Sequence, residues 1–400
     1  MQRVLASIAI LWVTAALPLP ASEADATAIS KNIQAVHMPF GTVLDPMFVS
    51  TDSDQIAGYT RCGDSALWAG HYLAAESFRY AVTKSPEALG NAERALDGIR
   101  SLVDVTGTDL LARCLVPESS PYAAGIASEE AHNGVYKGKL GGKTYLWIGN
   151  TSRDQYSGVM FGLSVAYTEI PDAAVRGEVR SLVTRVLRFL GKNDWKAVMP
   201  DGRVSTTFFG RFDQQLAFLA VGRQVDPQRF GGDYEWSRML YNQLVIAPVA
   251  LDTLDTHSSY FKFNLDAINL YTLRRLDAGA GQHGYDVFRH ATKSHGNAFF
   301  DVIDRGLNGP DAARDAEIRA LLAAWLRRPR RDFSVDLRGV LATCGSGQAC
   351  APIPVERRVN TDFLWQRSPF QLVGGGEGLI ETAGIDYILP YWMARFYGVL

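Results

Sequence analysis

Apolar residues recur every three or four positions along most of the chain, which is the spacing of one face of an α-helix. In the stretch 65–82, Leu67, His71 and Phe78 follow this spacing, and Asp64 stands before it where an N-cap is expected. The same spacing predicts helices over 86–105, 155–167, 173–190, 212–221, 234–249, 260–276, 284–301, 312–326 and 378–398. Strict alternation, the pattern of a strand, is confined to 142–148 and 333–341. The pattern therefore predicts an all-α protein.

Aspartates mark five of the predicted helices, each amid aromatic and small residues. They are Asp64, Asp154, Asp213, Asp266 and Asp386. A helical hairpin with its two connections takes about 50 to 60 residues. The intervals then count six hairpins, if 312–326 belongs to an unmarked hairpin and 114–150 is a long loop insertion. Six hairpins closed into a ring, an (α/α)6 toroid, explain this count within one large domain. An irregular helical bundle is the alternative.

The first 24 residues have the three zones of a secretory signal. Arg3 is followed by an uncharged apolar run over 4–17 and then by small residues suited to cleavage after position 21 or 24. An N-terminal membrane anchor is the alternative, but the run is shorter than the about 20 residues that span a bilayer. We therefore expect a secreted or periplasmic protein with one catalytic domain over 25–400 and no membrane span after cleavage.

The cysteine content agrees with export. The chain has 4 cysteines, an even number, as expected in an oxidising compartment. Cys344 and Cys350 flank a short Gly-containing loop that a disulfide can close, which leaves Cys62 to pair with Cys114. Free buried cysteines are the alternative. A zinc site is disfavoured, because no Cys-x-x-Cys occurs and no histidine lies at a ligand-like interval.

Composition narrows the classes of function. With 40 Lys+Arg against 42 Asp+Glu and 47% hydrophobic residues, the chain is neither disordered nor charged like a dedicated nucleic-acid binder. No dinucleotide fingerprint, phosphate-binding loop or His-Glu-x-x-His is present, so we expect no cofactor and no metal. The 8 Trp, 16 Tyr and 19 Phe exceed the needs of a minimal core and favour a surface on which sugars stack.

Two helix starts carry a resemblance to known enzymes. The stretches 63–68 (GDSALW) and 152–156 (SRDQY), in an exported chain, resemble those of (α/α)6-toroid carbohydrate-active enzymes. These include unsaturated glucuronyl hydrolases, other toroid glycosidases and toroid polysaccharide lyases. The resemblance implies an oligo- or polysaccharide substrate and a site at the wide end of the ring, lined by loops and by the ends of inner helices.

Glycoside hydrolysis uses two carboxyl groups, one to protonate the leaving group and one to activate water or attack carbon. We predict Asp64 and Asp154 as this pair, since each opens a candidate inner helix beside an arginine or an aromatic residue. Glu377 is the next catalytic candidate. The competing interpretations are that Asp64 only caps its helix and that Asp154 only forms an ion pair with Arg153.

Further candidates are polar or aromatic residues near helix starts that can hold a saccharide. They are Arg61, Trp68, His71, Arg153, Tyr156, Asp213, His257, Tyr260, Asn264, Trp365 and Glu381. Lone histidines are more often structural than catalytic, and Asp213 fits a hydrogen-bonded helix start as well as a binding site.

The leading prediction is therefore an exported glycoside hydrolase. The alternative is a polysaccharide lyase or uronate epimerase on the same ring. In that chemistry Tyr260 or His257 removes a proton beside a uronate carboxyl, and Asn264 or an arginine stabilises the enolate. A further alternative is a helical ring that acts on a terpenoid or a peptide, or a binding protein without catalysis.

Overall fold

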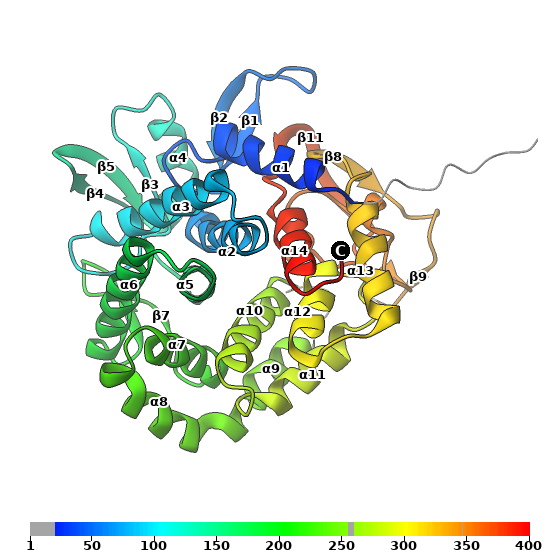
Figure 1. The fold of residues 1–400 in the computed structure, drawn as a ribbon. Coiled ribbons are helices and arrows are strands. Elements are labelled where there is room, and N and C mark those ends of the chain that lie inside the picture. The colour runs from blue at the N-terminus through cyan, green and yellow to red at the C-terminus, as the bar shows by residue number, and fades with distance from the viewer. Residues whose placement is uncertain (1–20, 255–259, 346) are drawn as a thin grey trace, which may run out of the picture.

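The computed structural model describes residues 21–254, 260–345 and 347–400. Helices dominate these ranges, and six of them form a closed inner ring (Figure 1). The inner helices are α2 (Ser65–Thr83), α5 (Arg153–Glu169), α7 (Phe212–Val225), α10 (Phe261–Leu276), α12 (Ala298–Asn308) and α14 (Ile385–Phe396). Each packs against the next, and α14 packs against α2 to close the ring.

A second layer of helices surrounds the inner ring. Five outer helices return the chain after an inner one: α3 (Pro86–Asp104), α6 (Ala173–Lys192), α8 (Pro227–Tyr241), α11 (Gln282–Thr292) and α13 (Ala312–Trp325). The sixth outer helix, α1 (Glu23–Asn32), comes from the start of the described chain and packs against α14. The protein is thus an (α/α)6 toroid, as predicted.

All the outer helices except α11 start with a side-chain cap. Asp172 Oδ1 accepts hydrogen bonds from the backbone N of Ala174 at 2.8 Å and of Val175 at 3.0 Å. Ser85 caps α3 and is followed by Pro86, which suits the first helical position because its missing N–H needs no partner there. Asp311 caps α13 in the same way, accepting from Arg314 N at 2.8 Å.

Short antiparallel strands decorate the ring. A four-stranded sheet has the order β2 (Ile56–Thr60), β1 (Asp45–Phe48), β11 (Val373–Glu381), β8 (Arg331–Asp336). A three-stranded sheet has the order β3 (Cys114–Pro117), β5 (Lys143–Ile148), β4 (Val135–Leu140). Two strand pairs are β6 (Lys196–Val198) with β7 (Val204–Thr207) and β9 (Thr343–Cys344) with β10 (Gln348–Ala349). The short helices α4 (Ala123–Glu129) and α9 (Ile246–Thr253) complete the described elements.

Four predicted elements need correction. The helix predicted over 234–249 is interrupted, because α8 ends at Tyr241 and α9 begins at Ile246. The stretch 284–301 is two helices, α11 and α12, because Gly296 has a φ of 57° and Asn297 caps a new helix through Phe299 N. The fifth inner helix is therefore α12, and 312–326 is an outer helix. The insertion 114–150 contains the three-stranded sheet and α4 rather than only loop. The Gly-rich 374–376 lies in strand β11, and the last helix begins only at Ile385.

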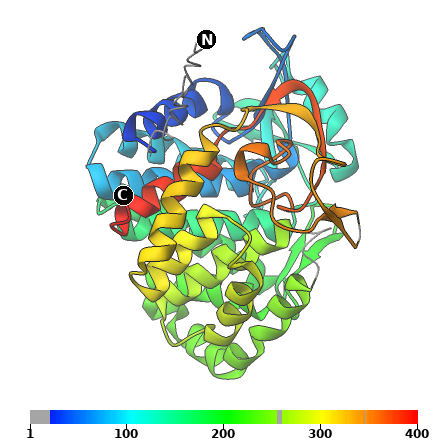
Figure 2. The ribbon, with the colours of Figure 1, turned by 90° about the vertical axis from the view of Figure 1, so that its right-hand side faces the viewer.

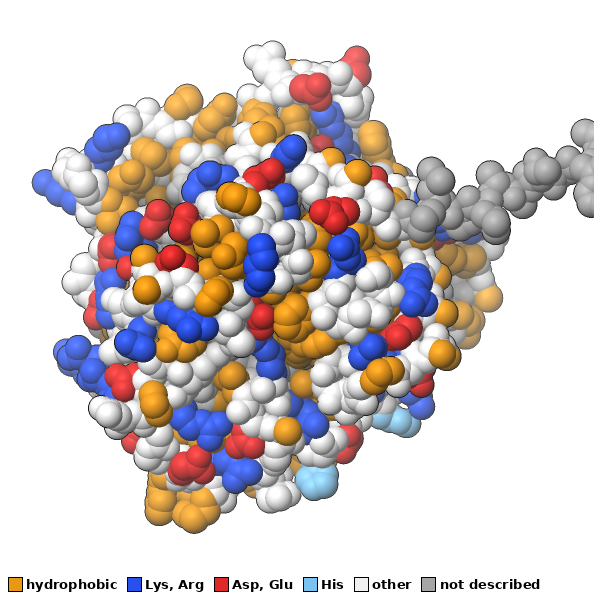
Figure 3. Space-filling model, in the orientation of Figure 1, with side chains coloured by type: hydrophobic (Ala, Val, Ile, Leu, Met, Phe, Trp, Pro, Cys, Tyr) orange, Lys and Arg blue, Asp and Glu red, His pale blue; other side chains and the backbone are white. Residues whose placement is uncertain are grey.

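One end of the ring carries most of the irregular chain. Figure 2 places the segment 337–372, in orange, at one end and the C-terminus, which follows α14, at the other. The inner helix α14 therefore starts at the end that carries this segment. On the opposite face, positive and negative side chains are interspersed (Figure 3), and no extended field of one charge sign is visible on that face.

Both predicted disulfides are present. Cys62 pairs with Cys114 and Cys344 pairs with Cys350. The first joins the turn before α2 to β3 and so fixes the chain two residues before Asp64. Within the described ranges, no helix combines the length and the apolarity that crossing a bilayer requires. Residues 1–20 lie outside those ranges, so the signal sequence stays a prediction.

Candidate active site

Helices α2 and α5 approach each other more closely than side chains would allow. A Cβ built on Gly70 would lie 2.0 Å from the backbone O of Gly158, and one on Gly158 would lie 2.5 Å from the backbone O of Leu67. Gly162 repeats the contact, with a Cβ position 2.3 Å from Gly70 O. The glycines therefore bring the two helices together, and with them the helix starts that carry Asp64 and Asp154.

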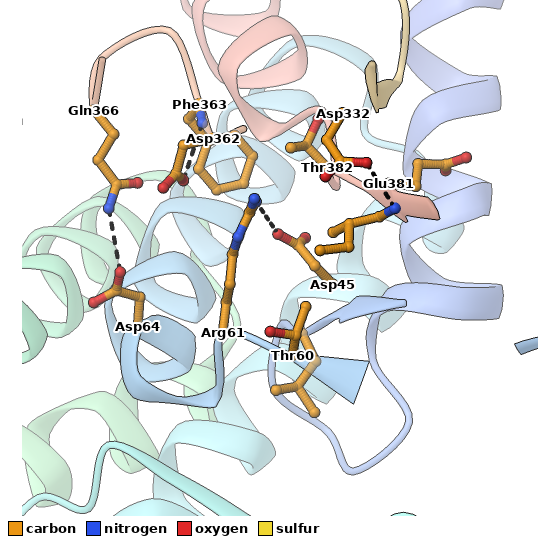
Figure 4. A network of polar contacts seen from close by, with 12 residues as sticks. Asp45, Thr60, Arg61, Asp64, Asp332, Asp362, Phe363, Gln366, Glu381 and Thr382 are labelled. Atoms are coloured by element: carbon orange, nitrogen blue, oxygen red, sulfur yellow. Dashed lines mark hydrogen bonds and ion pairs between the residues drawn. The ribbon is translucent and has the colours of Figure 1, made fainter. Parts of the chain in front are cut away.

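Asp64 occupies the N-cap position of α2 without capping the helix. Its backbone has φ −108° and ψ 4°, and its side chain accepts no hydrogen bond from the helix N–H groups. Instead, Oδ1 accepts from Gln155 Nε2 at 3.4 Å and Oδ2 accepts from Gln366 Nε2 at 3.2 Å (Figure 4). The interpretation of Asp64 as a plain helix cap is therefore wrong, and its carboxyl is not engaged in capping α2.

Asp154 is the second residue of α5, and its side chain is half-buried. Within the described ranges, its carboxyl forms no hydrogen bond or ion pair with another side chain, so the competing interpretation of an Arg153–Asp154 ion pair is wrong. Burial and then the negative charge of Asp64 raise the pKa of Asp154 to about 6. The two carboxyls are thus close enough to influence each other's protonation.

Arg61 enters the site on a strained backbone. It has φ 60° and ψ 31°, the left-handed region, which costs a non-glycine residue about 1 kcal/mol or more. Its Nη1 donates to Asp45 Oδ2 at 2.7 Å, and Figure 4 shows its side chain between Asp45 and Asp64. Arg61 thus neutralises part of the negative charge that gathers before α2.

Arg113 holds the turn before Asp64 from the other side. Its Nη1 donates to Gly63 O at 2.8 Å and its Nε donates to Asn150 O at 2.9 Å. Burial raises the pKa of Asp64, while the charge of Arg113 and the hydrogen bond from Gln366 act to lower it. The partners of Asp64 therefore favour its ionised form, whereas Asp154 has no such side-chain donor.

Asp362 is a third carboxyl beside this pair that the sequence pattern did not reveal. It is 7% exposed, and its Oδ1 accepts from Phe363 N at 3.1 Å. Burial raises the pKa of Asp362 to about 7; the charge of Arg61 opposes this shift and that of Asp64 adds to it. It lies in an irregular segment without periodicity, and its place just before Phe363 and Trp365 is the sequence signal that could have drawn attention to it.

Several predicted substrate-binding residues lie inside the ring core instead of at its surface. These are Trp68, His71, Tyr156, Asn264 and Trp365, all buried. His71 Nε2 lies 3.2 Å from Asn264 Oδ1 and Nδ1 lies 2.9 Å from Leu67 O. Burial lowers the pKa of His71 to about 4, so it is neutral at physiological pH. Contact of these residues with a substrate stays a prediction.

Asp213 belongs to a separate buried cluster at the start of α7. Arg211 Nη2 lies 3.1 Å from Asp213 Oδ2 and 3.4 Å from Asp266 Oδ1, and its Nη1 also pairs with Asp252. Burial raises the pKa of both Asp213 and Asp266. The Arg211 guanidinium thus pairs with all three carboxyls. Within the described ranges, no hydrogen bond or ion pair joins this cluster to Asp64.

The remaining candidates are dispersed. Tyr260 is buried, its OH lies 3.3 Å from His295 Nδ1, and burial raises its pKa above the usual range. His257 lies outside the described residues. Glu377 is exposed on β11. Glu381 accepts from Asn32 Nδ2 at 2.7 Å. Although burial alone would raise its pKa, the partner His37 and the charge of Arg330 hold the pKa of Glu381 at about 2.

Among the described residues, no group of three or more His, Cys, Asp or Glu has an arrangement that could hold a metal ion. No protein-family model matches the chain, and no curated protein matches it. One match among solved structures is a cellobiose 2-epimerase from Spirochaeta thermophila, with a TM-score of 0.43 and 9% identity over 94% of this chain and 98% of that chain. At this distance the likeness indicates no activity for this chain.

Proposed function

We propose that the protein is a carbohydrate-active enzyme, and specifically a glycoside hydrolase with Asp154 as general acid and Asp64 as general base or nucleophile. The observation that carries the proposal is the pair itself. Two carboxyls stand at the starts of adjacent inner helices, and the charge of Asp64 contributes to raising the pKa of Asp154 to about 6. Glycosidases need two carboxyls whose surroundings push their pKa values apart.

The surroundings assign the two roles. A general acid must hold its proton near the working pH, which suits the raised pKa of Asp154. A base or nucleophile must be ionised. Burial raises the pKa of Asp64, but two side-chain amides donate to its oxygens and Arg113 supplies positive charge, and these partners act in favour of the ionised form. Arg61 and Arg153, next to these carboxyls in sequence, are proposed to bind saccharide hydroxyl or carboxylate groups.

Export forms part of the proposal. The two disulfides agree with an oxidising compartment, and the first 24 residues have the pattern of a cleaved signal. A secreted or periplasmic location would give the enzyme access to oligo- or polysaccharides outside the cytoplasm.

The lyase or epimerase alternative has less support. It assigns the base to Tyr260 or His257, and burial raises the pKa of Tyr260 above its usual range, which makes its phenol harder to deprotonate. Its OH lies 3.3 Å from His295 Nδ1, and no carboxylate accepts a hydrogen bond from it within the described ranges. No observation on the described residues favours this alternative over the Asp64–Asp154 pair.

The test incubates the mature protein with a panel of neutral and uronate-bearing glycans. New reducing ends and the ultraviolet absorbance of unsaturated uronates are recorded in parallel. Reducing ends without absorbance, lost by at least about 10³-fold in Asp64→Asn and Asp154→Asn, are the expected result. Asp311→Asn is the matched control, because its carboxyl only caps an outer helix. Absorbance, or unchanged hydrolysis in both site variants, would contradict the proposal.

A further inference from the structure

The segment 359–372 enters the centre of the ring from the end that carries Asp64. Trp365 is fully buried, with its ring centroid 5.2 Å from that of His71 on α2 and 4.8 Å from that of Phe299 on α12. Phe363 packs 4.6 Å from Trp68. The segment therefore fills the axis of the ring with two aromatic side chains instead of leaving a channel.

A buried ion pair fixes this segment to the ring. Arg328 Nη1 lies 3.3 Å from Asp386 Oδ2 at the start of α14, and both side chains are nearly inaccessible. The same Asp386 oxygen accepts from Leu364 N at 2.9 Å. Arg328 Nη2 donates to Val359 O at 2.8 Å and to Asp362 O at 3.2 Å. The backbone just before Gln366 is thus held by a buried ion pair between Arg328, which follows the outer helix α13, and Asp386 on the inner helix α14.

The side-chain amide of Gln366 forms a hydrogen bond through its nitrogen but not through its oxygen. Its Nε2 donates to Asp64 Oδ2 at 3.2 Å, and no other side-chain hydrogen bond of Gln366 is formed within the described ranges. Its Oε1 is buried and has no partner there. A buried acceptor without a partner costs about 1–3 kcal/mol, which a hydrogen bond donated to this oxygen would recover.

We propose that Gln366 is a positioning residue for Asp64, which its amide holds in place in both protonation states of the carboxyl. With Asp64 ionised, Nε2 donates to it. With Asp64 protonated, a half-turn of the terminal amide lets the unpaired Oε1 accept the carboxyl O–H. As the general base, Asp64 would gain and lose a proton in each cycle, and such a partner would hold its carboxyl in place in both states. The inference rests on the proposed role of Asp64.

The groups that face Asp64 come from several elements. Arg61 and Arg113 are positive, and Glu130 is negative and accepts from Gly63 N at 2.8 Å. Two further carboxyls sense its charge, Asp154 on α5 and Asp362 in the 359–372 segment. None of these charged groups is altered by a substitution at Gln366, so a difference in the titration of Asp64 between the variants is due to the amide.

The first experiment follows the Asp64 carboxyl by NMR in the full chain labelled with ¹³C at aspartate carboxyls, with Asp64→Asn to assign its signal. In Gln366→Ala the hydrogen bonds to both forms of the carboxyl are lost, but the bond to the charged carboxylate is the stronger of the two. The pKa of Asp64 is therefore expected to rise by about one pH unit. Gln366→Glu, which conserves shape, is expected to raise it further by adding a like charge. Gln371→Glu, in the same segment but bonded to Val373 O, is the matched control and leaves it unchanged.

The second readout uses whichever glycan the panel shows to be cleaved. Gln366→Ala is expected to lower kcat about 10-fold with little change in KM, and Gln366→Glu to regain activity toward low pH, where the glutamic acid is a donor again. An Asp64 midpoint that is the same in Gln366→Ala and wild type overturns the inference, whatever the activity. Full hydrolysis by Asp64→Asn instead overturns the proposed function and leaves the titration result standing.

Discussion

Asp172 and Asp64 both stand immediately before a helix, yet their carboxyls have different partners. Asp172 accepts from two backbone N–H groups of α6, as a capping residue does. Asp64 accepts from the side-chain amides of Gln155 and Gln366 and leaves the N–H groups of α2 without a side-chain cap. Backbone carbonyls accept from the first N–H groups instead, since Ser65 N donates to Cys62 O and Ala66 N donates to Arg113 O at 2.9 Å. The start of α2 therefore does not depend on the Asp64 carboxyl.

Asp154 makes stability depend on pH in a direction that can be checked. Its pKa rises from 3.8 to about 6 on folding, so its contribution to stability is complete below about pH 4 and is lost as the pH rises through 6. Asp154→Asn removes the ionisable group and with it this decrease in stability at high pH. We expect the variant to be more stable than wild type at pH 7.5 by about 1–3 kcal/mol, and equal to it near pH 4. Urea unfolding between pH 4 and 7.5 measures this, and a difference independent of pH would contradict it.

Part of the candidate site could be predicted from single residues of the sequence. Asp64 and Asp154 could be identified because each interrupts an apolar pattern where an inner helix begins. Asp362 and Gln366 could not, since they lie in an irregular segment whose path depends on the buried Arg328–Asp386 pair. Burial of His71 and Trp365 also escaped prediction, because an aromatic residue in the ring axis has the same local pattern as one at its mouth.

At the scale of elements, the contact between α2 and α5 decides where the two carboxyls meet. A Cβ on Gly158 would lie 2.5 Å from the backbone O of Leu67, whereas nothing lies within 4 Å of a Cβ on Gly177 in α6. The same substitution, Gly to Ala in a helix, is thus expected to have opposite effects at the two positions.

Gly158→Ala should lower the free energy of unfolding by about 1–3 kcal/mol, because α2 and α5 must separate, and should reduce hydrolysis as Asp64 and Asp154 move apart. Gly177→Ala should raise it by about 0.5–1 kcal/mol through helix propensity alone and leave hydrolysis unchanged. Urea unfolding and the glycan assay measure both. Equal stability of the two variants would show that the helices do not pack as described.

Most helices were predictable because their apolar period is long and regular. The division of 284–301 was missed although its signals are present, with Gly296 at a positive φ and Asn297 as a cap. The strand around 374–376 was missed because the glycines suggest a turn. A Cβ on Gly375 would lie 2.2 Å from Phe333 O, so glycine is needed there to let β8 approach β11.

At the scale of the whole molecule, the ring closes through segments far apart in sequence. α1 packs against α14, and Arg395 Nη1 pairs with Glu23 Oε2 at 2.9 Å. Spacing along the chain predicted six hairpins, but it could not reveal that the sixth joins the two ends of the described chain. The packing of α1 against α14 depends on closure of the ring, and the local spacing of apolar residues carries no information about it.

The two disulfides should contribute unequally. Cys62–Cys114 spans 52 residues and Cys344–Cys350 spans 6, so chain entropy gives about 4 and about 2 kcal/mol. The double serine variant of the first pair is expected to lose more stability in urea, and also to lose hydrolysis, since Cys62 precedes Asp64 by two residues. The second variant should keep full hydrolysis. Equal losses of activity would contradict the proposed position of the site.

In the proposed mechanism Asp154 donates the proton and Asp64 does not. Aryl glycosides of the sugar that the panel identifies, with good and poor leaving groups, distinguish the two roles. Asp154→Asn is expected to lose about 10³-fold or more on the poor leaving group but only about 10-fold on one that departs without protonation, while Asp64→Asn loses activity on both. If the rate of hydrolysis by Asp154→Asn falls by the same factor on both substrates, Asp154 is not the general acid and the proposed mechanism is wrong.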